Sequence, residues 1–225
     1  MINLQHQFGG AQYEPTFSGI FKFEIKSFIG RLLSPRFRKP QASMIHLGSG
    51  VNLKSGFENI DFYTKKSLIA NFYPSRGDLK LVGHDLRYPL PYHAEVFEGA
   101  FSEHTLEHLT ANQARNLLKE VRRILKPNSC FRVIVPDLKQ YVDFYEGREV
   151  SSEFQKFATG SEAIWCLTHN WGHLSCWDAE LLIKELLLAG FSSARMVGFQ
   201  KGDFKQLMMD KEDRKWESVY VEAIA

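Results

Sequence analysis

The chain has 225 residues, which is enough for one substantial domain with a sizeable buried core. A hydrophobic content of 44% and a charged content of 24% exclude a disordered or fibrous chain, and a formal net charge of +2 argues against nucleic acid as a partner. No apolar run reaches the ~18 residues of a membrane span, and the start of the chain lacks a secretory signal pattern. Three cysteines without CxxC spacing indicate a reducing compartment, so we expect a cytoplasmic protein.

An N-terminal extension, residues 1–40, precedes a domain that we place at residues 41–225. Within the extension, residues 19–33 carry apolar side chains at helical spacing. One face of this helix would hold Ile25, Phe28, Ile29, Leu32 and Leu33. Two interpretations are open: a basic amphipathic segment, residues 19–39, that makes peripheral contact with an anionic membrane, or a helix that buries its apolar face on the domain. We favour the second, because most amphipathic helices pack on their own core.

The rest of the chain alternates predicted strands with predicted helices. The strands, in chain order, are expected at residues 44–48, 57–62, 79–82, 96–101, 130–135, 194–199 and 218–223. A short helix is expected in residues 64–78, and longer helices should begin after the capping residues Thr110, Asp137 and Asp178. Only residues 51–56 separate the first two strands, which is too few for a crossover helix. This order predicts an α/β fold with a doubly wound, mostly parallel sheet and a shortened first crossover.

Residues 148–177 show neither a helical nor a strand period and hold many aromatic and polar side chains, His169 and His173 among them. A long stretch of this kind is uncommon in a folded domain unless it has a function. We therefore predict a lid or a substrate loop here.

A glycine bend follows the first predicted strand, where Gly48 and Gly50 flank Ser49. Glycine lets the backbone approach a ligand closely, because no Cβ stands in the way. Asp61 closes the second predicted strand, and its carboxylate can accept both hydroxyls of a ribose. Together these residues indicate a nucleoside-containing cofactor at the carboxyl edge of the sheet.

An ordered set of motifs extends this pattern along the chain. It comprises His46-Leu47-Gly48-Ser49-Gly50, Gly56-Phe57-Glu58-Asn59-Ile60-Asp61, His84-Asp85-Leu86, Phe101-Ser102-Glu103-His104-Thr105-Leu106-Glu107-His108-Leu109, Leu125-Lys126-Pro127 and Val135-Pro136-Asp137-Leu138. Over residues 44–223 the chain resembles the class I S-adenosylmethionine-dependent methyltransferases, in particular the type 11-like branch found among polysaccharide and cell-envelope biosynthesis genes. The resemblance implies a Rossmann-like methyltransferase fold of the seven-stranded type.

The resemblance also implies a site for S-adenosyl-L-methionine as cofactor. Its residues would be Gly48, Ser49, Gly50, Asp61, Asp85, Leu86, Ser102 and Glu103. The two glycines would pass beneath the methionine part, Asp61 would hold the ribose, and Asp85 with Leu86 would lie at the adenine. One departure from the family pattern is His46, which replaces the acid that many relatives have there, so the methionine amino group must be contacted from elsewhere.

Three histidines are candidates for removing the proton of an acceptor: His104, His169 and His173. We rank His104 first, because the residues after the fourth strand of this fold lie near the transferable methyl, and we regard His173 as a second catalytic candidate. Asp137 would orient the base. We thus expect methylation of a hydroxyl, or as a second choice an amine, on a small-molecule, glycan or lipid-linked acceptor. Neither the Asn-Pro-Pro-Tyr motif of adenine methylation nor a Pro-Cys nucleophile pair occurs.

Two alternatives come from other functional classes. The first is a non-catalytic scaffold protein that uses the fold to bind the cofactor. The second is a zinc hydrolase, because His104, Glu107 and His108 match the H-x-x-E-H motif, in which two histidines on one helix face bind zinc. We disfavour the hydrolase, since no segment further along the chain stands out as a third ligand, and we predict no metal.

Overall fold

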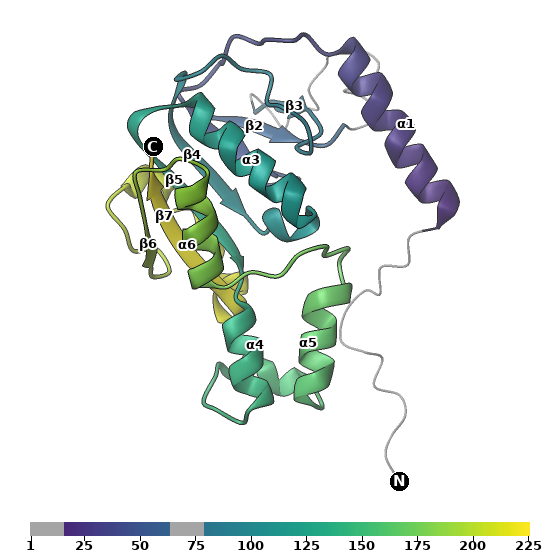
Figure 1. The fold of residues 1–225 in the computed structure, drawn as a ribbon, viewed down its shortest axis with the longest axis vertical. Coiled ribbons are helices and arrows are strands. Elements are labelled where there is room, and N and C mark those ends of the chain that lie inside the picture. Colours follow the sequence, from purple (N-terminus) through teal and green to yellow (C-terminus); the bar gives the residue numbers. More distant parts are fainter. Residues whose placement is uncertain (1–15, 64–78) are drawn as a thin grey trace.

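The computed structural model describes residues 16–63 and 79–225, and within them a seven-stranded sheet has the order β3-β2-β1-β4-β5-β7-β6 (Figure 1). The strands are β1 (Met44–Leu47), β2 (Phe57–Asp61), β3 (Leu81–Gly83), β4 (Phe97–Glu103), β5 (Leu125–Pro136), β6 (Ser193–Val197) and β7 (Ser218–Ile224). Strands β1 to β5 pair in parallel, while β7 runs antiparallel to both β5 and β6. The predicted α/β fold with a mostly parallel sheet is confirmed. The short helix expected in residues 64–78 lies outside the described residues.

Three helices begin directly after the predicted capping residues Thr110, Asp137 and Asp178. They are α1 (Phe17–Leu33), α3 (Ala111–Ile124), α4 (Leu138–Tyr145), α5 (Gly160–His169) and α6 (Ala179–Leu188), with 3₁₀ turns η1 (Leu106–His108), η2 (Ser152–Lys156), η3 (Lys205–Leu207) and η4 (Glu212–Glu217). Thr110 and Gln113 form a complete capping box at α3. Asp137 accepts a hydrogen bond from the Lys139 amide at α4, and Asp178 caps α6. Between β1 and β2 there is no helix, so the shortened first crossover is also confirmed.

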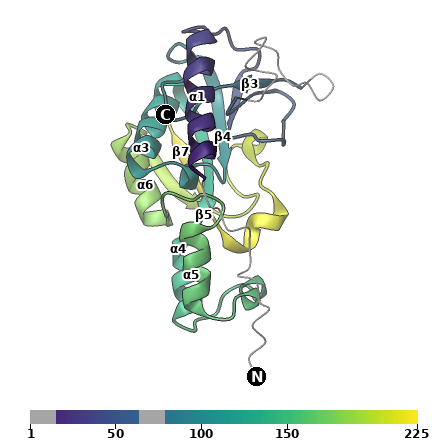
Figure 2. The same cartoon turned by 90° about the vertical axis from the view of Figure 1, so that its right-hand side faces the viewer.

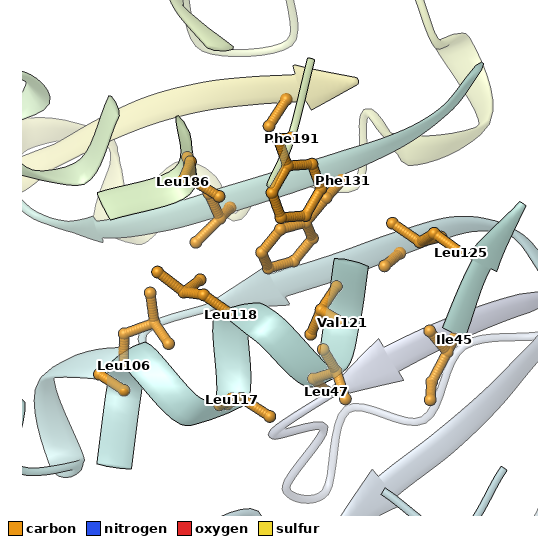
Figure 3. Close-up of a cluster of buried hydrophobic side chains, with 14 of the residues drawn as sticks. Ile45, Leu47, Leu106, Leu117, Leu118, Val121, Leu125, Phe131, Leu186 and Phe191 are labelled. Carbon is orange, nitrogen blue, oxygen red and sulfur yellow. The ribbon is translucent and has the colours of Figure 1, made fainter. Parts of the chain in front are cut away.

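Helices α3 and α6 cover one face of the sheet and form the main core with it (Figures 1 and 3). Leu118 and Val121 of α3 and Leu186 of α6 are fully buried there. Their neighbours include Phe131 of β5, whose ring stacks on that of Phe191 at 6.0 Å between centroids. This packing fixes the order of the central strands and therefore the edge at which their carboxyl ends meet.

One charged side chain is fully buried within β5. Arg132 of β5 is 0% exposed, and its guanidinium donates to Asp210 and Glu222. Because both carboxylates bind the same guanidinium, the charge is satisfied within the protein. The segment with Asp210 is thereby held against the sheet, on the path that leads to η4 and the site described below.

Helix α1 differs from the favoured prediction, because its apolar face is exposed. Phe28 and Leu32 are 61% and 73% exposed, and only Ser27 and Gly30 of the helix are buried. Gly30 packs on the ring of Tyr63, where any Cβ would collide with the aromatic carbons. Figure 1 shows α1 to one side of the sheet, beyond β2 and β3. No helix in residues 16–63 or 79–225 combines the length and apolar character that crossing a bilayer requires.

The stretch predicted as an aperiodic loop, residues 148–177, contains η2 and α5 and is therefore partly helical. Helix α5 packs beside α4, and both project beyond the sheet (Figures 1 and 2). A small separate core holds this unit together, made of Tyr141, Phe154, Phe157, Ala163, Cys166 and Leu167. Its aromatic residues explain why no helical period is visible in the sequence: they pack on α4 locally and not on the main sheet.

Candidate active site

The site begins at the bend after β1, where Gly48 and Gly50 adopt φ values of 68° and 53°. The amide of Gly48 donates to the carbonyl of Ile60 at 2.9 Å, which ties the bend to the end of β2. A Cβ on Gly48 would lie 2.0 Å from Thr105 Oγ1, whereas a Cβ on Gly50 would meet nothing within 4 Å. Only glycine fits the first position, and the second is open to a ligand.

Asp61 is fixed beside this bend. Its Oδ2 accepts a hydrogen bond from the Gly50 amide at 2.5 Å, and its Oδ1 accepts one from the Phe62 amide at 2.5 Å. Burial raises the pKa of Asp61, although the hydrogen bonds from Gly50 and Phe62 oppose the shift. Each carboxylate oxygen retains a further lone pair, so the group can still accept a hydrogen bond from a ligand.

A pocket of about 400 Å³ opens at this edge of the sheet, within the usual size range of small-molecule sites. Several segments of the chain line the pocket. The bend after β1 supplies Gly48, Ser49 and Gly50, and the end of β4 with η1 supplies Glu103, His104, Glu107 and His108. The 148–177 segment supplies Lys156, Trp171 and His173, and the segment before β7 supplies Arg214 and Trp216. Pairing of Leu47 with both Ile60 and Ser102 brings the carboxyl ends of β1, β2 and β4 together here.

Two buried hydroxyls at this edge lack partners. Ser49 Oγ and Ser102 Oγ are both buried without a hydrogen bond, and Ser49 lines the pocket. Glu103 also lines it, with Oε1 accepting from the Lys211 amide at 2.8 Å. Burial raises the pKa of Glu103. A polar ligand at the bend would satisfy the orphaned serine hydroxyl, so the residues present fit a nucleoside cofactor.

Asp85 and Leu86 lie away from the pocket lining. The Asp85 carboxylate accepts hydrogen bonds from Ser27 Oγ of α1 at 2.5 Å and from the Arg87 guanidinium at 2.7 Å. Burial favours a higher pKa, but the hydrogen bonds from Arg87 and Ser27 outweigh it and hold the pKa of Asp85 below its usual value. Leu86 packs against the main core. Protein groups thus occupy much of the acceptor capacity that the predicted adenine contact would use, and that contact stays a prediction.

His46 does not line the pocket and contacts Asn59 and Phe101 instead. Its Nδ1 lies 3.3 Å from Asn59 Oδ1, and its ring packs edge-on to Phe101. Burial lowers the pKa of His46 to about 4, so the imidazole is neutral at physiological pH. It adds no charge to the bend, in agreement with the expectation that the methionine group is contacted by other residues.

His104 stands at the end of β4 in a left-handed backbone conformation, with φ 51°. Its Nε2 is 2.8 Å from Ser218 Oγ, and the single hydroxyl hydrogen of Ser218 is donated to the carbonyl of Arg214 at 2.6 Å. His104 Nε2 must therefore carry the proton, which leaves Nδ1 as an acceptor. Burial, with a smaller contribution from Arg214, lowers the pKa of His104 to about 3.

Three further groups converge beside it: Glu107, His108 and His173, whose ligand atoms all lie within 4.8 Å of one another. The carboxylate of Glu107 is buried, and burial raises its pKa to about 8. The ring centroids of His108 and His173 are 5.0 Å apart. The H-x-x-E-H motif signalled two of these residues, but η1 is a 3₁₀ turn and His104 precedes it, so the two motif histidines do not share one α-helix face.

The remaining catalytic candidates are further from this group. His169 is exposed near the end of α5, with its ring stacked on that of Trp165. Asp137 caps α4, and its carboxylate accepts from the Lys139 amide. Burial raises the pKa of Asp137. Its predicted role in orienting the base is not tested by these contacts and stays a prediction.

Residues 59–133 match the family model described as methyltransferase domain, which covers about a third of the chain. No curated protein matches the sequence. The chain is similar in structure to one chain of a complex between the Haloferax volcanii Trm112 methyltransferase activator and a putative methyltransferase, at 16% identity and a TM-score of 0.50, covering 91% of this chain and 92% of that chain. It is also similar to a methyltransferase from Thermotoga maritima, at 15% identity and a TM-score of 0.51, covering 91% and 90%. A third similar structure, a methyltransferase from Archaeoglobus fulgidus, has 15% identity, a TM-score of 0.50 and coverage of 93% and 100%.

The fold is that of the class I S-adenosylmethionine-dependent methyltransferases. The family match and the fold together support a methyltransferase of this type, and S-adenosylmethionine is the cofactor that they imply. The match spans β2 to β5 and therefore includes Asp61, Asp85, Glu103 and His104. It stops short of the 148–177 segment, which supplies the opposite wall of the pocket.

Proposed function

We propose that this protein transfers a methyl group from S-adenosylmethionine to a hydroxyl group, or as a second choice an amine, of a small-molecule, glycan or lipid-linked acceptor. One observation carries the proposal: the glycine bend and the histidines of the β4 end line the same pocket. A cofactor placed on the bend and an acceptor placed against the histidines would be neighbours, and alignment of the two reactants is the main catalytic requirement of methyl transfer.

The bend supplies the proposed cofactor contacts. Gly48 and Gly50 would lie beneath the methionine part, and the Ser49 hydroxyl would gain the partner that it lacks. Asp61 would accept from the ribose hydroxyls with the lone pairs that its two backbone hydrogen bonds leave unused. Bound there, S-adenosylmethionine supplies an activated methyl group on a sulfonium.

The protein must also remove a proton from the acceptor. Two of the histidines that line the pocket each have an unprotonated ring nitrogen. One is His104 Nδ1, because Nε2 donates to Ser218. The other is His173 Nε2, because Nδ1 lies 2.6 Å from the carbonyl of Leu167 and must donate to it. Burial lowers the pKa of His173, so its ring is neutral at pH 7 and Nε2 keeps a lone pair, although the same shift makes the ring a weaker base.

The far wall of the pocket supports a glycan or another large acceptor. Trp171 is 53% exposed and lines the pocket, so an indole face is open to a flat or apolar ligand surface. Lys156 lies 3.6 Å over the ring of Trp216, and both residues line the same wall. Aromatic faces next to cationic groups suit an acceptor that combines an apolar face with a negative charge.

Radiolabelled methyl transfer from S-adenosylmethionine to a panel of acceptors tests the proposal. The panel should contain hydroxyl-bearing glycans, lipid-linked sugars, primary amines and nucleic acid. We expect label on the hydroxyl-bearing acceptors, with the rate lowered at least about 100-fold in a His104→Gln/His173→Gln variant. Label confined to nucleic acid, or cofactor binding without transfer to any acceptor, would reject it.

The exposed face of α1 supports a second proposal, peripheral membrane contact through residues 19–39. Phe17, Phe28 and Leu32 are exposed, and so are Lys22 of α1 and Lys39 beyond its end. We propose that this face rests on an anionic membrane surface, since exposed aromatic and aliphatic residues beside lysines favour such a surface.

Sedimentation with vesicles checks the membrane contact. We expect the protein to sediment with phosphatidylglycerol vesicles but not with neutral phosphatidylcholine vesicles. A Lys22→Glu/Lys39→Glu variant should lose most of this binding, because each basic residue near an anionic surface contributes about 1 kcal/mol. Equal sedimentation of the variant and the wild type would remove the electrostatic part of the proposal, and no sedimentation of the wild type would remove all of it.

A further inference from the structure

We propose that Glu107, His108 and His173 bind a divalent transition-metal cation in the pocket, where the cation coordinates the acceptor hydroxyl. One carboxylate and two imidazoles are the protein ligands of many open catalytic metal sites, which keep a further position for water or substrate. The ligand atoms here lie within 4.8 Å of one another. In a tetrahedral site with bonds of about 2.1 Å the ligand atoms lie about 3.4 Å apart, so small side-chain movements close the site.

The environment of the Glu107 carboxylate also indicates a bound cation. Its side chain is 2% exposed, and neither carboxylate oxygen has a hydrogen-bond partner. Burial, with smaller contributions from Glu217 and Glu103, raises its pKa, and the Arg214 guanidinium donates to Glu217 at 2.9 Å and not to Glu107. A buried carboxylate without donors is costly. A cation placed against it would remove that cost.

The hydrogen bonds around the imidazoles point to the same place. His173 donates from Nδ1 to the Leu167 carbonyl at 2.6 Å, which leaves Nε2 as a ligand atom. Metal-bound histidines commonly donate their other ring N–H to a carbonyl in this way. His104 Nδ1, also unprotonated, lies 3.4 Å from Glu107 Oε1. Two lone pairs that face each other at this distance require a proton or a metal cation nearby.

The backbone joins the two segments that supply the ligands. The amides of Leu174 and Ser175 both donate to the carbonyl of Glu107, at 2.7 and 3.1 Å. His173 is therefore held next to η1, although it comes from the far end of the 148–177 segment. His108 is exposed whereas Glu107 is buried, so the group opens toward the pocket and is accessible to a ligand from that side.

This inference rests on the proposed function for its chemistry. The cation would bind the acceptor hydroxyl oxygen and lower its pKa, so that the hydroxyl proton can leave to water at neutral pH. The acceptor oxygen then forms its bond to the methyl carbon as the bond between that carbon and sulfur breaks, and the sulfonium leaves as a neutral thioether. As a ligand, His173 would not act as the base.

Metal titration of the full chain tests the proposal. Chelator-treated protein is titrated with Co²⁺ by visible absorption and with Zn²⁺, Mn²⁺ and Mg²⁺ by calorimetry. We expect one Co²⁺ or Zn²⁺ per chain, with affinity reduced about 100-fold or more in Glu107→Gln and in His108→Ala. His169→Ala is the matched control, because it removes an exposed histidine of the same region and should bind like the wild type.

Circular dichroism and melting curves establish that each variant is folded, and the exposed position of His108 makes that variant the safer one. Absence of Co²⁺ and Zn²⁺ binding to the wild type would overturn the proposal, as would equal affinity in the wild type and His108→Ala. Titration of the same metal-free samples with S-adenosylhomocysteine separates the two hypotheses. Nucleoside binding without metal binding rejects only the metal site, and metal binding without nucleoside binding rejects the proposed function.

Discussion

Replacing Gly48 by alanine should destabilise the domain by about 2–4 kcal/mol and abolish binding of the cofactor. Gly48 has φ 68°, a region that costs an alanine roughly 1–2 kcal/mol. In addition, its Cβ would lie 2.0 Å from Thr105 Oγ1 and 2.6 Å from Thr105 Cγ2. Either the bend or the β4 end must move, and both line the pocket. Urea denaturation and calorimetry with S-adenosylhomocysteine measure the two effects.

Gly50→Ala is the matched control for this substitution. Gly50 also has a positive φ, 53°, but a Cβ there meets nothing within 4 Å. It should therefore show the backbone cost alone, roughly 1–2 kcal/mol. The difference between the two variants isolates the collision with Thr105, and equal stabilities would show that the bend is looser than the structure indicates.

Glu107→Gln should remove the pH dependence of stability that one buried carboxyl imposes on the metal-free protein. Burial raises the pKa of Glu107 from its usual 4.5 to about 8. Between these values the folded state binds one proton more than the unfolded state, so the free energy of unfolding falls as pH rises, by about 1.4 kcal/mol per pH unit. The penalty is absent below pH 4.5 and complete above about pH 8, where it reaches roughly 5 kcal/mol.

Glutamine has no charge to bury, so the variant should gain stability relative to the wild type as pH rises from 5 to 9. Urea unfolding of chelator-treated samples across this range measures the gain. Glu98→Gln, at an exposed glutamate that pairs with Lys126, should leave the slope unchanged. Parallel pH profiles for Glu107→Gln and the wild type would show that Glu107 is not the buried, unpartnered carboxyl that the structure describes.

Local signals in the sequence predicted much of the fold. Capping residues such as Thr110 and Asp178 placed the starts of α3 and α6, because a cap acts within one helical turn. The number of residues between β1 and β2 was enough to predict the missing helix. Two predictions were wrong because periodicity does not show what a helix packs against. Helix α5 packs on α4 and not on the sheet, and the apolar face of α1 is exposed.

Arg132 illustrates the same limit inside a strand. Nothing near it in the sequence indicates that it is buried, because Asp210 and Glu222 come from segments far along the chain. The burial of a charged residue in a central strand can be predicted only when its partners are known, because the desolvation free energy of an unpaired buried charge is too large.

The candidate site was predictable in part. Gly48, Ser49, Gly50, Glu103 and His104 line one pocket, as the motifs suggested, because the carboxyl ends of neighbouring parallel strands meet at one edge. The sequence did not predict that His173 would join Glu107 and His108. Nor did it show that Ser27 and Arg87 would engage Asp85, because Ser27 lies on α1, whose position on the domain was not foreseen.

Calorimetry of the full chain with S-adenosylhomocysteine and, in parallel, with NAD tests the central claim most directly. The account predicts that S-adenosylhomocysteine binds one to one in the micromolar range, that Asp61→Ala weakens it by at least about tenfold, and that NAD does not bind. Binding of NAD but not of S-adenosylhomocysteine, or an Asp61→Ala variant that binds S-adenosylhomocysteine as tightly as the wild type, would contradict it.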